Sequence, residues 1–426
     1  MSLSERDLKV LWHPYTQMKT ARSPIGIVRG EGAWLYDEDG NGYLDAISSW
    51  WVNTMGHSNP HIAKEVAEQL NTLEHVLFAG FTHPKAVELA ERLLKVLPKN
   101  QSRIFLSDNG STAVEVAIKM ALQFWNNKGQ QKNKIIAFHG AYHGDTFGAM
   151  SVSGRGAFVA PFESLLFEVE FIEVPTPGSE NASSRQLNEL IEREKDNLAA
   201  FIYEPLIQGA SGMIMYEPEA LDALLTICGS NNILTIADEV MTGFGRTGKY
   251  FASEYMTVDP DIICMSKGIT GGTMALGATS SSAEMYDAFY SDDKLKTFFH
   301  GHSYTANPVA CSAACASLDL YDEEETWVAV DRIGKQHQKF AERLTGLANI
   351  KDVRQRGTII AIELNTDGGT SYFSNIRDSI YDHFIGKGII LRPLGNIIYI
   401  LPPYIISEED LQSIYDAIIE FLDNKA

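Results

Sequence analysis

The chain contains two apolar runs that each lead into a charged residue: Ile233-Leu234-Thr235-Ile236-Ala237-Asp238-Glu239-Val240 and Asp261-Ile262-Ile263-Cys264-Met265-Ser266-Lys267-Gly268. Both runs have the length and the apolar content of buried β-strands. In an open α/β sheet, ligands bind beyond the carboxyl ends of the parallel strands. We therefore expect the side chains of Asp238 and Lys267 to converge on one crevice.

An acid and a lysine in one crevice match the needs of pyridoxal 5'-phosphate (PLP), which requires a Schiff-base amine and an anion facing its ring nitrogen. In this hypothesis, Asp238 keeps the ring nitrogen protonated. Lys267 binds the cofactor and then moves a substrate proton as a general base. Taken singly, each residue also fits an ordinary structural role, a cap for Asp238 and a solvated amine for Lys267.

Apolar strand patterns alternate with amphipathic helices between about residues 60 and 320, which predicts βαβ units and a mostly parallel sheet. Residues 30–50 read as a β-hairpin. A long helical stretch over about 308–344 leads into a last α+β portion, with strands near 357–364 and 396–400. We expect the hairpin and this portion to form a small domain beside the large one. The strands expected in the sheet are 103–106, 134–138, 199–203, 233–237 and 261–265.

Composition narrows the class of protein. Thirty-five basic residues against 55 acidic ones give a formal net charge of −20, which opposes binding to nucleic acid or an anionic membrane. No signal peptide is apparent, and no apolar run reaches the roughly 18 residues of a membrane span. The four cysteines are too few and too scattered for a disulfide framework. We expect a cytoplasmic protein with ordinary buried thiols.

A phosphate cradle is predicted where the strand at 103–106 leads into Ser107-Asp108-Asn109-Gly110-Ser111-Thr112 and then a helix. Unpaired N–H groups and the positive end of the helix dipole would face the anion. The pattern is not a Walker loop, since no Gly-Lys-Ser/Thr follows. A simple helix N-cap remains an alternative for this segment taken alone.

Aromatic and charged side chains elsewhere fit a pocket around a flat cofactor. Tyr142, in His139-Gly140-Ala141-Tyr142-His143-Gly144, could lay its ring on a heteroaromatic ring. The two histidines are four residues apart, but glycines break the helix that would align them, so we expect no metal. Arg392 either grips a substrate carboxylate or lies on the surface. The aromatics that form either a substrate-pocket wall or core filling are Tyr15, Trp50 and Trp51.

Two motif look-alikes are better explained as turns. Residues 243–248 spell G-x-G-x-x-G, yet no apolar helix opens after them, as a dinucleotide fold requires. Residues 37–42 match the start of an EF-hand loop, but its twelfth position is Ser48 rather than glutamate.

Together these segments resemble the class III (ω-) aminotransferases of PLP fold type I, over essentially the whole chain. The resemblance implies an α/β fold, with a large PLP-binding domain around a mostly parallel sheet of the seven-stranded type and a smaller α+β domain built from both termini. We expect residues 1–55 and 321–426 in the small domain and 56–320 in the large one. The motifs are Gly110-Ser111, Tyr142-His143-Gly144, Asp238-Glu239-Val240, Gly243-Phe244-Gly245-Arg246-Thr247-Gly248 and Lys267-Gly268.

Three further segments resemble the members of this family that act in biotin biosynthesis: Trp12-His13-Pro14-Tyr15-Thr16-Gln17-Met18, Ser49-Trp50-Trp51 and Arg392-Pro393-Leu394-Gly395-Asn396. This resemblance implies ping-pong transfer of an amino group from S-adenosylmethionine to 8-amino-7-oxononanoate, giving 7,8-diaminononanoate. It also implies a homodimer with active sites at the interface. The alternatives are lysine as donor in the same pathway, another ω-aminotransferase acting on a diamine, ornithine or ω-amino acid, a non-catalytic PLP-fold binding protein, and a dinucleotide oxidoreductase.

The resemblance also assigns roles by position. Lys267, Asp238 and Tyr142 would be catalytic, and Arg392 would receive the carboxylate of both substrates in turn. The family usually reads His-Gly-Pro-Thr-Phe where this chain has residues 300–304, so His302 replaces a proline and alters the loop. The cofactor would be bound by Gly110, Ser111, Tyr142, Asp238 and Lys267, with His302 and Ser303 from the other subunit. The substrate pocket would be lined by Tyr15, Trp50, Trp51, Tyr142, Lys267 and Arg392, with Gly301 from the other subunit.

Overall fold

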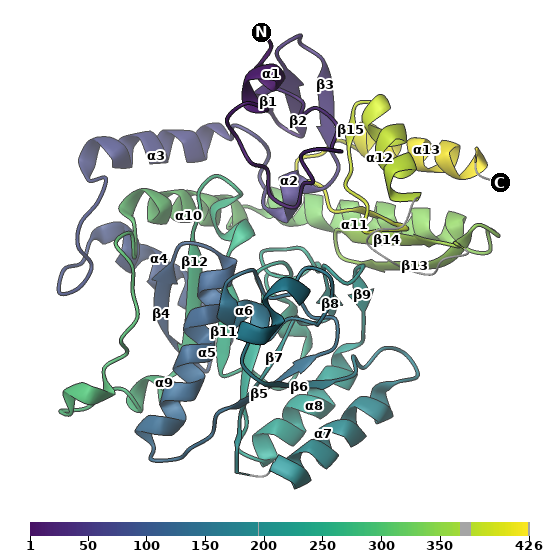
Figure 1. Cartoon of the computed structure of the whole chain (residues 1–426). Helices are drawn as coiled ribbons and strands as arrows, with labels where there is room; N and C mark the ends of the chain where they lie inside the picture. The colour runs from purple at the N-terminus through teal and green to yellow at the C-terminus, as the bar shows by residue number, and fades with distance from the viewer. Residues whose placement is uncertain (195, 367–375, 425–426) are drawn as a thin grey trace.

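The computed structural model describes residues 1–194, 196–366 and 376–424. A seven-stranded sheet in the order β4-β12-β11-β10-β7-β5-β6 forms the centre of the larger body, in the lower part of Figure 1. All neighbours pair in parallel except β12, which is antiparallel to both β11 and β4. The expected mostly parallel sheet is confirmed, whereas β6 and β12 were not expected. The strands are β4 (Gln101–Ser107), β5 (Lys134–Phe138), β6 (Val169–Ile172), β7 (Leu198–Tyr203), β10 (Leu234–Asp238), β11 (Ile262–Met265) and β12 (Gly277–Ser282).

The sheet is buried on both faces. Successive side chains of each strand point to opposite sides of the sheet and enter two different cores. Ile202 and Ile236 belong to a core that they share with α5 (Gly110–Asn127). Phe201 and Ala237, their neighbours in sequence, belong to a second core that includes α8 (Pro218–Ser230). Strands buried in this way read as unbroken apolar runs, which is why the sequence reveals them.

The two ends of the chain meet in a small sheet. The expected hairpin is present as β2 (Trp34–Asp37) and β3 (Gly42–Asp45), and β15 (Ile389–Ile390) pairs in parallel with β3. In Figure 1 this sheet lies above the large one, beside α12 (Ile376–Gly386) and α13 (Glu408–Asp423). A second sheet joins β13 (Ile350–Arg356), β14 (Ile359–Leu364) and β16 (Ile397–Ile400). The domain division at residues 55 and 320 stays a prediction.

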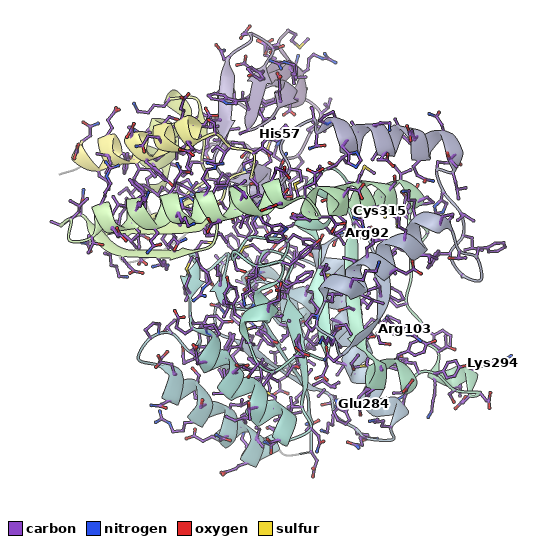
Figure 2. All side chains as sticks on the ribbon, turned by 180° about the vertical axis from the view of Figure 1, so that it is seen from behind. His57, Arg92, Arg103, Glu284, Lys294 and Cys315 are labelled. Carbon is purple, nitrogen blue, oxygen red and sulfur yellow. The ribbon has the colours of Figure 1, made fainter. Side chains whose placement is uncertain are left out.

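The helical stretch expected over 308–344 consists of two helices, α10 (Pro308–Tyr321) and α11 (Glu324–Leu344). Arg92 of α4 (Pro84–Val96) donates to Asp319 at 2.7 Å and to Asp322 at 2.8 Å, so it ties α4 to the end of α10. Figure 2 shows Arg92 beside Cys315 of α10. All four cysteines are buried free thiols, as expected, and burial raises the pKa of the Cys311 thiol to about 12.

The remaining elements connect these parts. Among the residues that the structure describes, the helices lack the combined length and apolar character needed to cross a membrane. These elements are α1 (Leu3–Asp7), β1 (Ile27–Glu31), α2 (Ser48–Trp51), α3 (Pro60–Thr72), α6 (Phe147–Ser151), α7 (Glu180–Glu194), β8 (Ile207–Gln208), β9 (Ile214–Met215), α9 (Ala283–Asp287) and the 3₁₀ turns η1 (Ala160–Leu165), η2 (Ala252–Tyr255), η3 (Lys267–Thr270) and η4 (Lys294–Lys296).

Both motif look-alikes are turns. In the segment 243–248, Arg246 is only 1% exposed and donates to the carbonyls of Pro402 at 2.8 Å and Asn53 at 3.3 Å. This guanidinium therefore ties the N-terminal and C-terminal portions to the large sheet. In the hairpin turn, the Asp37 carboxylate accepts hydrogen bonds from the backbone N–H of Asp39 and Asn41.

A buried histidine links α11 to the C-terminal helix. His337 is fully buried, its Nδ1 accepts from the Tyr415 hydroxyl at 2.7 Å, and its Nε2 donates to the Thr358 carbonyl at 3.1 Å. Burial lowers the pKa of His337 to about 3. The folded state therefore holds this imidazole neutral where an unfolded chain would protonate it.

We expect the substitution His337→Gln to weaken the acid sensitivity of folding. Below about pH 6.5, His337 binds a proton in the unfolded chain but stays neutral in the folded protein. The wild type therefore loses stability as the pH falls towards about 3. Urea denaturation at pH 6.5 and 4.5 measures how much unfolding free energy is lost on acidification. This loss should be smaller by about 1–3 kcal/mol in the variant. Tyr415→Phe retains the imidazole and should keep the wild-type dependence. Equal losses in wild type and His337→Gln would contradict this view.

Candidate active site

Asp238 and Lys267 leave the large sheet at the same edge. In the parallel pairing of β10 with β11, Asp238 stands opposite Cys264, and Lys267 opens η3 directly after that strand. Both residues line a cavity of about 620 Å³. The structure thus brings together the expected cofactor residues of this chain, Gly110, Ser111, Tyr142, Asp238 and Lys267.

Lys267 has two properties of a functional amine. Its backbone φ of +48° lies in the left-handed region, which costs a side-chain-bearing residue free energy and occurs at functional sites. Burial lowers the pKa of its amine to about 8, although the negative charges of Asp238 and Glu204 act in the opposite direction. The amine lies 4.7 Å from the centre of the Trp51 ring.

Asp238 is fixed by a histidine that the sequence analysis did not connect with it. His143 Nδ1 lies 2.6 Å from Asp238 Oδ2, and the N–H of Val240 donates to Oδ1 at 3.1 Å. His143 Nε2 is buried and lacks a hydrogen-bond partner among the described residues. His139, in contrast, is exposed and stacks on Phe171. The two histidines therefore do not form a ligand pair.

The N-terminus of α5 supplies hydrogen-bond donors beside the lysine. Asn109 caps the helix by accepting from the N–H of Thr112 at 2.9 Å. The N–H groups of Gly110 and Ser111 precede any acceptor in their own helix. Gly144 approaches them with φ +128°, and a Cβ at this position would overlap the Ser111 side chain. The N-cap and the anion cradle are therefore properties of one segment.

A second cavity of about 440 Å³ shares Tyr142 and Lys267 with the first and extends to Arg392. The guanidinium of Arg392 lies 4.8 Å from the centre of the Trp50 ring. The Tyr15 hydroxyl donates to Asp145 at 2.5 Å and lies 3.3 Å from that of Tyr142. The predicted substrate residues Tyr15, Trp50, Trp51, Tyr142, Lys267 and Arg392 all line this cavity.

The two tryptophans stand on a left-handed turn. Ser48, Ser49, Trp50 and Trp51 have φ values of +53°, +45°, +73° and +74°. Each such residue costs about 1–2 kcal/mol. Asp45 compensates by accepting from the Ser49 N–H at 2.9 Å and the Ser49 hydroxyl at 2.7 Å. Without a glycine, the sequence carries no signal for this backbone.

Other contacts also hold the turn in place. Ser48 Oγ donates to the Leu401 carbonyl at 2.7 Å, and the Trp51 indole N–H donates to the Tyr399 hydroxyl at 3.0 Å. Asp45 is itself fixed by His57, whose Nε2 lies 2.9 Å from its carboxylate. Figure 2 shows His57 where the N-terminal portion meets the rest of the molecule. The wall of the second cavity therefore depends on residues from both ends of the chain.

Three predicted residues do not line either cavity: Gly301, His302 and Ser303. They lie between η4 and α10, where the His302 ring accepts from the N–H of Tyr304 at 3.2 Å. This histidine thus supports the local turn at the position where the family resemblance implied a proline. The roles of all three toward another subunit stay predictions. The cavity-lining polar residues that the sequence analysis left unassigned include Asp145 and Glu204.

Known proteins share this arrangement of sequence and fold. The family described as Aminotransferase class-III matches residues 15–422. Two relatives are named adenosylmethionine-8-amino-7-oxononanoate aminotransferase. The one from Synechococcus elongatus is 47% identical, over 97% of this chain and 98% of its own length. The one from Geobacter sulfurreducens is 39% identical, over 98% and 96%.

Solved structures agree with the sequence comparison. The crystal structure of the enzyme of that name from Methanocaldococcus jannaschii has a TM-score of 0.94 and 36% identity, over 99% of this chain and 98% of that one. An omega transaminase from Pseudomonas jessenii, in complex with PMP, has a TM-score of 0.92 and 28% identity, over 100% and 98%. The fold is therefore PLP fold type I, and this protein belongs to the class III aminotransferases.

Proposed function

We propose that this protein transfers the amino group of S-adenosylmethionine to 8-amino-7-oxononanoate, giving 7,8-diaminononanoate in biotin biosynthesis, with PLP as its cofactor. The convergence of Asp238 and Lys267 on one cavity carries the proposal, since this pair matches the needs of that cofactor. The names of the relatives supply the two substrates.

The residues of the first cavity fit PLP. Lys267 would bind it covalently, Asp238 would face its ring nitrogen, and Tyr142 would stack on its ring. The N-terminal N–H groups of α5 at Gly110 and Ser111 would bind its phosphate. Once bound, the cofactor would supply an electron sink for the electron pair released at the substrate carbon.

The chain's own groups would move and hold the protons. The Lys267 amine would take the proton from the α-carbon of the donor, which requires the neutral amine that its lowered pKa favours. His143 would keep Asp238 oriented through its 2.6 Å contact. The Val240 N–H holds the second carboxylate oxygen at 3.1 Å, so both oxygens of Asp238 are fixed by groups of this chain.

The second cavity fits the substrates. Trp50 and Trp51 would line the path of an aliphatic chain, and Arg392 would pair with its carboxylate. The Tyr15–Asp145 hydrogen bond lies beside Tyr142, where the reacting end of the substrate would be held.

We further infer a homodimer in the cytoplasm. The segment that carries Gly301, His302 and Ser303 exposes large apolar side chains, with Phe299 at 69% and Tyr304 at 66%. A second copy of the chain would cover these side chains and receive the roles assigned to the segment. The four free thiols support a reducing compartment.

The absorption spectrum of the purified protein tests this function. We expect a visible band from bound PLP that bleaches with S-adenosylmethionine and returns with 8-amino-7-oxononanoate. Lys267→Ala should lose the lysine-linked band and at least about a thousandfold in turnover, because it removes both the covalent anchor and the base. A band that S-adenosylmethionine leaves unchanged, but that lysine or an ω-amine bleaches, would show that S-adenosylmethionine is not the amino donor. Unaltered turnover in Lys267→Ala would reject the mechanism.

The reactivity of Lys267 should rise through an unusually low pH range. Only the neutral amine is nucleophilic, and with a pKa of about 8 rather than 10.5 its neutral fraction at pH 7 is about 300-fold larger than for an ordinary lysine. Labelling of the cofactor-free protein with an amine-selective reagent, followed by peptide mass spectrometry, should give a midpoint near pH 8. Lys267→Arg supplies the background, and a midpoint near 10.5 would contradict the expectation.

Arg392→Met should weaken use of 8-amino-7-oxononanoate by removing a two-pronged charged pair. Such hydrogen bonds contribute about 1.5–3 kcal/mol, so kcat/KM should fall about 10- to 150-fold. The analogue 2-aminooctan-3-one lacks the carboxylate and serves as the matched control. The variant should process it as the wild type does. An equal loss of kcat/KM for both compounds would show that Arg392 does not bind the carboxylate.

A further inference from the structure

Glu204 is a buried carboxylate in the first cavity that the proposed mechanism leaves unused. It directly follows β7, is 5% exposed, and lines the cavity with Lys267 and Asp238. A buried charge is retained only where other groups compensate its desolvation. Its contacts therefore indicate what it does there.

Each carboxylate oxygen of Glu204 binds the backbone of a different loop. Oε1 accepts from the N–H of Tyr142 at 3.0 Å, and Oε2 accepts from the N–H of Gly209 at 3.0 Å. Its own carbonyl accepts from the Tyr216 hydroxyl. Only a carboxylate accepts at both positions, because the amide nitrogen of a glutamine would oppose one of the N–H groups.

The two loops contact different residues of the site. One carries the Tyr142 ring and His143, which holds Asp238. The other lies against the substrate wall, since a Cβ on Gly209 would stand 3.0 Å from the Trp51 ring. One side chain therefore links the loop that carries Tyr142 to the loop that packs against Trp51.

Glu204 also acts on the charge of the lysine. Burial raises the pKa of Glu204 to about 7, and it lowers that of Lys267 to about 8. The negative charge of Glu204 stabilises the Lys267 ammonium, so its loss would lower the pKa of the lysine further. The other titratable and charged groups that act on this pair are Asp238, His143, Tyr216 and Arg246.

We propose that Glu204 is a positioning residue of the amino-transfer site: it fixes the Tyr142 and Gly209 loops through their N–H groups, and it places a carboxylate charge in the cavity that holds the Lys267 amine. This inference rests on the proposed function for the meaning of the site. The contacts and charges themselves are independent of which substrates the protein uses.

The test is the labelling midpoint of Lys267 in cofactor-free protein carrying Glu204→Gln. We expect the midpoint to fall by about half a pH unit or more, because a buried negative charge near the amine is removed. Glu239→Gln is a matched control. Glu239 is a buried carboxylate that likewise bridges two backbone N–H groups, those of Ala252 and Ser253, but it does not line the cavity. Its variant should keep the wild-type midpoint.

A second variant tests the positioning role and also covers a failure of Glu204→Gln to fold. Glu204→Asp keeps the charge but withdraws it from both N–H groups. We expect a midpoint close to that of the wild type and at least about tenfold weaker PLP binding, measured by absorption. Wild-type PLP affinity in Glu204→Asp, or an unchanged midpoint in folded Glu204→Gln, would overturn the proposal. Since labelling needs no substrate, failure of S-adenosylmethionine as donor would reject the function and leave this result standing.

Discussion

The parallel pairing of β10 with β11 is the constraint on which the site depends. Its register directs Asp238 and Lys267 to one edge of the sheet, and the other site groups follow strands that end at that edge. The helix N-terminus at Gly110 follows β4, the Tyr142 loop follows β5, and Glu204 follows β7. The site is therefore built from the carboxyl ends of five strands, with a rigid sheet fixing their spacing.

Burial acts on the two central groups of the site in opposite directions. It raises the pKa of the Glu204 carboxyl and lowers that of the Lys267 amine, so both move towards neutrality. The neutral amine of Lys267 is the form that the proposed proton transfer requires. The same dry surroundings strengthen the contact between His143 and Asp238.

The elements that the sequence predicted and the elements that it missed are stabilised in different ways. β10 and β11 are buried on both faces and read as apolar runs, which exposed the positions of Asp238 and Lys267. β12 was not expected because its Gly277–Ser282 segment is small and polar, and its buried hydroxyls bind partners that only the fold supplies, such as Gln101 Oε1 for Ser280 at 2.7 Å. The left-handed turn at Ser48–Trp51 and the contact of Glu204 with Tyr142 depend likewise on residues distant in sequence.

The joining of the chain ends has a consequence for the order of assembly during synthesis. β3 stays without its β15 neighbour until the ribosome has released residues 389–390, and the turn that carries Trp50 and Trp51 waits for Leu401 and Tyr399. The strands that carry the cofactor groups are complete long before. The half of the site proposed to hold the cofactor can thus form on the nascent chain, whereas the half proposed to select the substrate is completed only after Tyr399 and Leu401 have been made.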